Sequence, residues 1–166
     1  ALLTYSIAEI LWRGGSRWLR LALALNAAGW PVYVIPFVTL DFTLHEVFWN
    51  TSPGLPLWMR IASSWAGGGG SLYLFSVLAS LAGLYLLRGR RRSRWLELGV
   101  ALATATGIAA AFLNDAFTRL PVAPASGAGL NPLLKSPWLY PHPLLTFGGY
   151  SLLTIASIGI LAGTGR

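Results

Sequence analysis

His142 is the side chain in this sequence best placed to bind a metal. It lies in the segment LNPLLKSPWLYPHPLLTFGGY (residues 130–150), between Pro141 and Pro143 and directly before an apolar run. Proline on both sides restricts the backbone and removes two donors, which predicts that the imidazole projects from a stiff, non-helical segment. A histidine where a loop meets a membrane helix can ligate a metal or haem iron, or it can be an ordinary interfacial residue. The residue type alone leaves both roles open.

Few other residues in the sequence could bind a metal or take part in catalysis. The only other histidine is His45, and there are no cysteines. The lack of cysteine excludes thiolate-bound metals, iron–sulfur clusters, dithiol redox chemistry and covalent attachment of haem to this chain. Five carboxylates give acid–base hydrolysis little to work with, and phosphate-binding and metalloprotease motifs are absent.

The composition is that of an integral membrane protein. Of the 166 residues, 55% are hydrophobic and only 10% are charged, against about 25% charged in soluble domains. The net charge of +7 comes mainly from arginines at the ends of apolar runs. Such arginines orient helices in a bilayer, so the charge argues against nucleic acid as a partner. The predicted spans hold essentially no ionisable residue, which argues against an ion-coupled transporter.

The apolar runs predict an all-α membrane protein with about four complete transmembrane helices. The predicted spans are Trp18–Leu40, Ser71–Leu87, Trp95–Leu113 and Leu144–Gly163. Pro31 and Pro36 should kink the first of them, and Asn26 should face a neighbouring helix. Residues 1–12 are too short to span, and we expect them to be the inner end of a truncated N-terminal helix. Residues 1–166 are predicted to form a single membrane domain.

Two long connections, Asp41–Gly69 and Asn114–Pro143, separate the predicted spans. The first is rich in tryptophan, phenylalanine and proline, which indicates a position along the membrane–water boundary. It ends in four glycines, Gly67 to Gly70. These glycines allow close approach of another backbone or a flat ligand, or they form a flexible hinge.

The distribution of basic residues predicts the topology in the cell membrane. One set of nine arginines falls on one side of the spans: Arg13, Arg17, Arg20, Arg88, Arg90, Arg91, Arg92, Arg94 and Arg166. Only Arg60, Arg119 and Lys135 fall on the other. The positive-inside rule places the first set, with the Arg88–Arg94 loop, in the cytoplasm. Both long loops, with His45 and His142, then face outward. The arginine run also suits acidic lipid head groups, although orientation alone explains it.

Several segments resemble the CcmF/NrfE type of cytochrome c haem lyase. DFTLHEVFWNTSPGLPLWMRIASSW (residues 41–65), followed by GGGGSLYLFSVL, is similar to the family's first large periplasmic region. GLNPLLKSPWLYPHPLLTFGGY (residues 129–150) is similar to the family pattern D-L-N-P-L-L-Q-D-P-x-x-x-x-H-P-P-x-L-Y-x-G-Y, and FLNDAFTRLP to S-N-P-F-x-R. The resemblance runs from about Trp18 to the end of the chain.

The resemblance implies a function. The family binds haem b at its outer face and joins the haem vinyl groups to cysteine thiols of an apocytochrome c. His142 matches the family's first outer axial histidine. Arg60 matches a motif position and is a candidate contact for a haem propionate, or an anchor of its loop through a salt bridge. Trp65 is a possible haem contact.

The sequence departs from the family in ways that imply an incomplete site. The tryptophan-rich W-G-x-x-W-x-W-D signature, the second outer histidine and the membrane-embedded histidine pair are missing. The family's His-Glu before Gly-Ser is replaced by glycines, and His45 is only a remote substitute. We therefore expect one half of a split haem lyase. Its partners would be a C-terminal half with the tryptophan-rich motif, apocytochrome c, its thiol-handling chaperone and membrane lipid. The alternative is a non-catalytic packing subunit of a larger membrane redox complex.

Overall fold

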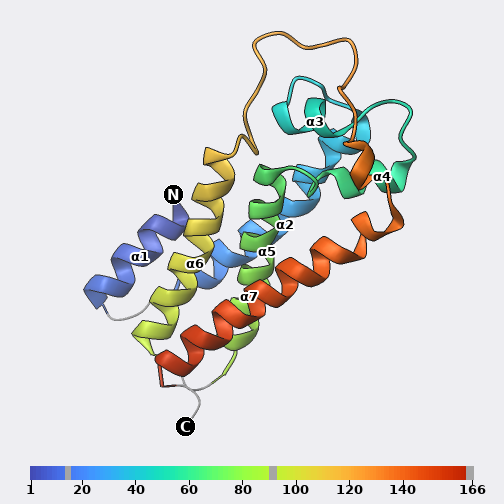
Figure 1. Ribbon diagram of the computed structural model, residues 1–166. Coiled ribbons are helices and arrows are strands. Elements are labelled where there is room, and N and C mark those ends of the chain that lie inside the picture. The colour runs from blue at the N-terminus through green and yellow to red at the C-terminus, as the bar shows by residue number, and fades with distance from the viewer. Residues whose placement is uncertain (14–15, 90–92, 164–166) are drawn as a thin grey trace.

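The computed structural model describes residues 1–13, 16–89 and 93–163, and it is built from helices (Figure 1). The elements, in chain order, are α1 (Leu2–Arg13), α2 (Leu19–Thr39), α3 (His45–Asn50), α4 (Leu57–Ser63), α5 (Gly68–Leu86), α6 (Arg94–Leu113), the 3-10 turns η1 (Pro132–Leu134) and η2 (Pro137–Leu139), and α7 (Pro141–Leu161).

Four helical segments are long and apolar enough to cross a bilayer, which confirms an all-α integral membrane protein. They are α2, α5, α6 and Pro137–Leu161, of 21, 19, 20 and 25 residues. At 1.5 Å per residue, each reaches about the 30 Å of a hydrocarbon core. The predicted spans agree with α2, α5 and α6 within a few residues, whereas α7 begins three residues earlier than expected. Helix α2 continues through both Pro31 and Pro36.

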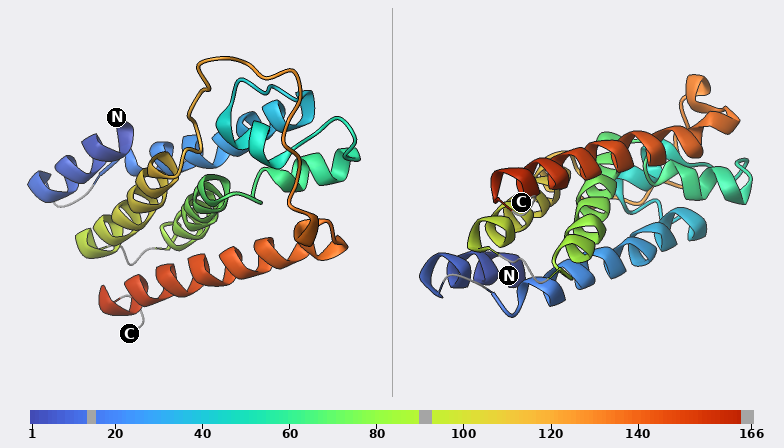
Figure 2. Two further views of the ribbon diagram at one scale, coloured as in Figure 1. Left: turned by 45° about the horizontal axis from the view of Figure 1, so that its top comes forward. Right: turned by 90° about the horizontal axis from the view of Figure 1, so that it is seen from below.

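Helix α5 lies at the centre of the bundle and packs against α2, α6 and α7 (Figure 2). Four small residues of α5 are buried and allow close packing: Ser76, Ala79, Ser80 and Gly83. Gly83 faces Val100 of α6, and Gly107 of α6 faces Ser76. As predicted, Asn26 faces a neighbour, because its Nδ2 donates to Ser80 Oγ at 3.0 Å.

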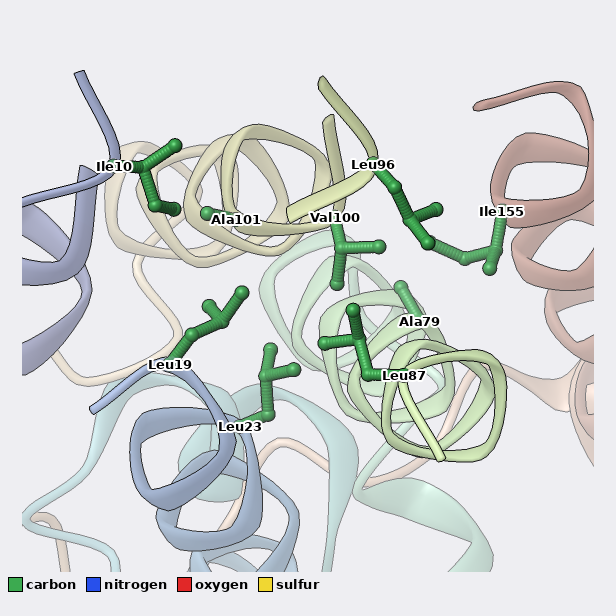
Figure 3. Close-up of a cluster of buried hydrophobic side chains, with 9 residues drawn as sticks. All are labelled: Ile10, Leu19, Leu23, Ala79, Leu87, Leu96, Val100, Ala101 and Ile155. Atoms are coloured by element: carbon green, nitrogen blue, oxygen red, sulfur yellow. The ribbon is translucent and has the colours of Figure 1, made fainter. Parts of the chain in front are cut away.

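Helix α1 packs on α6 and α2 at one end of the bundle. A core joins five helices there (Figure 3); it consists of Ile10, Leu19, Leu23, Ala79, Leu87, Leu96, Val100, Ala101 and Ile155. Burial of these side chains fixes the helices that lead to the opposite end, where the candidate site lies.

The two long connections lie together at the end of the bundle opposite this core (Figure 1). They are tied by an isolated bridge between Leu44 and Arg119, and the Leu120 amide donates to the Thr43 carbonyl at 2.7 Å. Arg13, Arg17, Arg20, Arg88 and Arg94 belong to the other end, as the sequence predicts, whereas Arg90, Arg91, Arg92 and Arg166 lie outside the described residues. Which end faces the cytoplasm stays a prediction.

Candidate functional site around His142

His142 lies in the first turn of α7, so the prediction of a non-helical setting is wrong. Helix α7 begins at Pro141, with Pro143 two residues further on. The first amides of a helix have no intrahelical acceptor, so the missing N–H groups of these prolines remove no helix hydrogen bond. Proline also favours helical φ at this position. The two prolines therefore start the helix and fix the backbone that carries the imidazole.

The His142 side chain is exposed, and within the described part of the chain it has no hydrogen-bond partner. It lines a shallow groove of about 200 Å³ whose other walls are mainly apolar: Leu133, Leu134, Ser136, Trp138, Leu139 and Pro143. A neutral imidazole without a protein partner keeps a ring nitrogen free to ligate a metal.

The turns η1 and η2 form the apolar wall beside His142. In each, a polar side chain caps the turn before a proline: Asn131 Oδ1 accepts from the Leu133 amide at 3.0 Å, and Ser136 Oγ accepts from the Trp138 amide at 3.3 Å. This local chemistry is readable from Asn-Pro and Ser-Pro. In these turns Leu133 is 89% and Trp138 71% exposed. Two large apolar side chains therefore lie on the protein surface next to an imidazole without a hydrogen-bond partner.

Trp65 connects the first long loop to the segment that carries His142. Its Nε1 donates to the Leu139 carbonyl at 2.9 Å. The ring is only 4% exposed, stacks on Trp30 at 6.2 Å and meets Tyr140 edge-on at 5.5 Å. Trp65 is therefore not part of the groove lining. Its hydrogen bond instead positions the backbone of Leu139, three residues before His142.

Arg60 anchors its own loop, but not through the salt bridge that the sequence offered. Its Nε donates to the Leu55 carbonyl and its Nη2 to the Pro53 carbonyl, both at 2.8 Å. Among the described residues, no carboxylate lies within ion-pair distance of Arg60. Arg60 is not in the lining of the His142 groove, and a contact with a propionate stays a prediction.

The glycine tract brings backbones close together, which is one of the roles that the sequence leaves open. Gly68, Gly69 and Gly70 form the first turn of α5. A Cβ on Gly69 would lie 2.6 Å from the Ala116 amide nitrogen, and one on Gly70 would collide with the Ser64 carbonyl oxygen. The glycines thus bring the start of α5 against both long connections.

Glu46 is a structural residue that the sequence analysis missed. Its side chain is 5% exposed; Oε1 accepts from the Gly69 amide at 3.0 Å, and Oε2 accepts from Asn50 Nδ2 at 2.8 Å. It therefore caps α5 from a different helix, where a carboxylate complements the helix dipole. Glu46 and Gly69 are 23 positions apart, and no local sequence pattern joins the two.

The Glu46 carboxyl should make stability depend on pH. Burial raises its pKa above the ordinary value of 4.5, although the Gly69 and Gly70 amides and His45 oppose the shift. A folded-state pKa above that of the unfolded chain means stability that is present at low pH and lost as pH rises through the raised value. The melting temperature should therefore fall as the pH rises from 4.5 toward the raised pKa of Glu46. Glu46→Gln should make the melting temperature less dependent on pH in this range. An unchanged curve in this variant would contradict the assignment.

His45 does not join His142 in the groove. It begins α3, where its amide donates to the Thr118 carbonyl at 2.9 Å, and its ring lies 6.2 Å from that of Trp49. Its Nδ1 is buried without a partner in the described structure. The groove at His142 therefore offers a single histidine from this chain.

Comparison with known proteins shows to which family the chain belongs. The profile of the family described as Cytochrome C assembly protein matches residues 65–164, which include Trp65, both 3-10 turns and His142. The chain is 34% identical over 142 residues to the cytochrome c-type biogenesis protein CcmF of Escherichia coli, covering 81% of this chain and 22% of that protein. It is 32% identical over 121 residues to NrfE of Haemophilus influenzae, covering 69% and 19%.

The match to ccl1 of Rhodobacter capsulatus, also a cytochrome c-type biogenesis protein, is 29% identical over 157 residues and covers 87% of this chain and 24% of that protein. The chain thus spans about a quarter of the length of the curated relatives it matches. No solved structure is significantly similar. Because the profile covers more than half of the residues and the relatives agree with it, the chain belongs to the cytochrome c assembly protein family.

Proposed function

We propose that this chain acts in cytochrome c maturation by holding haem b at the outer membrane face through His142. The observation that supports this most directly is the exposed, unpaired imidazole beside Leu133 and Trp138. In this reaction haem b is a substrate, and its vinyl groups form bonds with the cysteine thiols of an apocytochrome c. The chain's own task is to bind and orient it.

The residues of the groove suit one part of a haem. A neutral imidazole is a common axial ligand of haem iron, and exposed leucine and tryptophan side chains offer apolar contact to a flat macrocycle. Trp65 supports the assembly from behind, because its hydrogen bond to Leu139 fixes the turn that precedes His142. The polar side-chain groups of the lining are the Ser136 hydroxyl, the Trp138 indole N–H and the His142 ring, so orientation would depend on few contacts.

The groove alone is too small for the whole ligand. Its volume of about 200 Å³ lies below the range of about 300–1,000 Å³ typical of small-molecule sites. We therefore propose that groups beyond these 166 residues complete the haem site within a single membrane assembly. Those groups would supply the tryptophan-rich platform and further histidines, and apocytochrome c with its thiol-handling chaperone would dock on the same face.

The lone chain should bind haem weakly. The groove offers one histidine and part of an apolar wall. Titration of the purified chain with haem should therefore give no stable spectrum of iron bound by two histidines. Addition of the segment that carries the missing motif, fused to these residues or co-expressed with them, should produce it. A stable bis-histidine spectrum from these 166 residues alone would contradict an incomplete site and would implicate His45 as the second ligand.

A non-catalytic packing subunit is the second candidate. It is favoured by the engagement of Arg60 with two loop carbonyls and by the burial of Trp65, which leave few polar groups around the groove. In that case the fold would stabilise a larger membrane redox complex without touching haem. Maturation that is independent of the His142 side chain would favour this second candidate.

A further inference from the structure

We propose that the end of the bundle opposite His142 carries a binding site for an anionic phospholipid, in a groove between α1 and α6. This inference concerns a different surface and does not depend on haem binding. The groove has a volume of about 100 Å³ and is lined by Ile10, Leu11, Arg94, Trp95 and Leu98. Its lining combines apolar side chains with the exposed guanidinium of Arg94 and indole of Trp95.

The charge at this end of the bundle is strongly positive. Five described arginines belong to it: Arg13, Arg17, Arg20, Arg88 and Arg94. Its two described carboxylates are already engaged, because Glu97 Oε2 accepts from the Ser16 amide at 2.7 Å and Glu9 Oε2 accepts from Ser16 Oγ at 2.8 Å. The only ion pair among the described residues joins Glu9 to Arg17, so Arg94 is left without an acidic partner there.

Arg94 and Trp95 have the chemistry of a lipid head-group contact. The Arg94 guanidinium lies over the Trp95 ring at 4.8 Å from its centroid, and the indole itself is 60% exposed. Tryptophan favours the membrane–water boundary, and a guanidinium binds phosphate oxygens through two parallel hydrogen bonds. A phosphate at the mouth of the groove would therefore lie at the depth where lipid head groups lie.

The apolar walls distinguish a phospholipid from a free anion. Ile10 projects from α1 toward α6 (Figure 3) and belongs to the lining of the groove. Leu11, which is 66% exposed, and the half-buried Leu98 complete the apolar walls of the groove. A free phosphate would use only Arg94, whereas a phospholipid uses the arginine through its phosphate and the leucines through an acyl chain. Charge complementarity selects an acidic head group over a zwitterionic one.

The full chain, purified in a mild detergent, can be titrated with phosphatidylglycerol and with phosphatidylcholine and followed by native mass spectrometry. We expect tighter retention of phosphatidylglycerol. Arg94→Gln should weaken its binding about fivefold, in line with the attraction of one basic residue for an acidic lipid surface. The matched control is Arg20→Gln, which removes the same charge at the same end but outside the groove, and it should change little.

Two further arms decide between the possible ligands. Leu11→Gln alters an exposed wall without disturbing the core, and it should weaken retention of phosphatidylglycerol as Arg94→Gln does. Soluble glycerol 3-phosphate should fail to compete with the lipid. Equal losses from Arg94→Gln and Arg20→Gln would show diffuse charge without a site, and would overturn the proposal. So would full retention in Leu11→Gln, or effective competition by glycerol 3-phosphate.

Discussion

His142→Ala is expected to lower covalent cytochrome c maturation by more than about tenfold, because removal of even an outer-shell partner at a metal site lowers affinity about 10–100-fold. The amount of protein in the membrane should not change. The side chain is exposed and lacks a described hydrogen bond, and surface changes of this kind alter stability by only about 0.5 kcal/mol. Haem staining of the cytochrome, beside an immunoblot of this chain, separates the two effects.

The matched control for that experiment is His45→Ala. This histidine contacts Trp49 and does not line the groove, so its loss should leave maturation close to normal. If His142→Ala matures cytochrome c normally, the role of His142 as a ligand is wrong, and the packing subunit becomes the better description.

Gly70→Ala is expected to be strongly destabilising despite the small size of the change. The added methyl group would collide with the Ser64 carbonyl oxygen, and its next neighbours are the Ser64 carbonyl carbon at 3.0 Å and the Tyr33 hydroxyl at 3.2 Å. Overpacking costs about 1–3 kcal/mol, more where backbone must move. The higher helix propensity of alanine recovers at most about 1 kcal/mol. The apparent melting temperature in detergent should therefore fall clearly.

Gly149→Ala is the matched control for the glycine effect. Gly149 lies inside α7, and nothing lies within 4 Å of a Cβ built there. The same substitution should leave the melting temperature unchanged or raise it slightly, because alanine favours the helix by up to about 1 kcal/mol. If Gly70→Ala is as stable as Gly149→Ala, the close approach of α5 to the Ser64 carbonyl does not hold.

The membrane helices could be predicted because their signal is local. Apolar runs of about 20 residues mark spans without any knowledge of their neighbours, and α2, α5 and α6 lie where those runs predict. The start of α7 was missed because proline was treated as a helix breaker, although it is favoured in a first turn. The short helices α3 and α4 were missed as well. Their 6 and 7 residues are too few to be stable alone and depend on tertiary contacts such as that of His45 with Thr118.

The candidate site was predictable only in part, for the same reason. His142 and the proline turns before it form one continuous segment, so residue type and spacing were enough to single it out. The contact of Trp65 with Leu139 joins residues 74 positions apart, and the capping of α5 by Glu46 crosses 23 positions. Nothing in the order of residues links such partners. Arg60 looked free to bind a carboxylate because the two loop carbonyls that it contacts are created by the fold.

Rescue of His142→Gly by imidazole tests the central claim most directly. A glycine at this exposed position leaves space for a free imidazole to take the place of the lost ring as a ligand. Cells that produce this variant should make little haem-stained cytochrome c, and imidazole in the medium should restore part of it. The variant His142→Leu, whose side chain fills the space, should not respond. Normal maturation in His142→Gly without imidazole would contradict the proposal that His142 binds the haem iron.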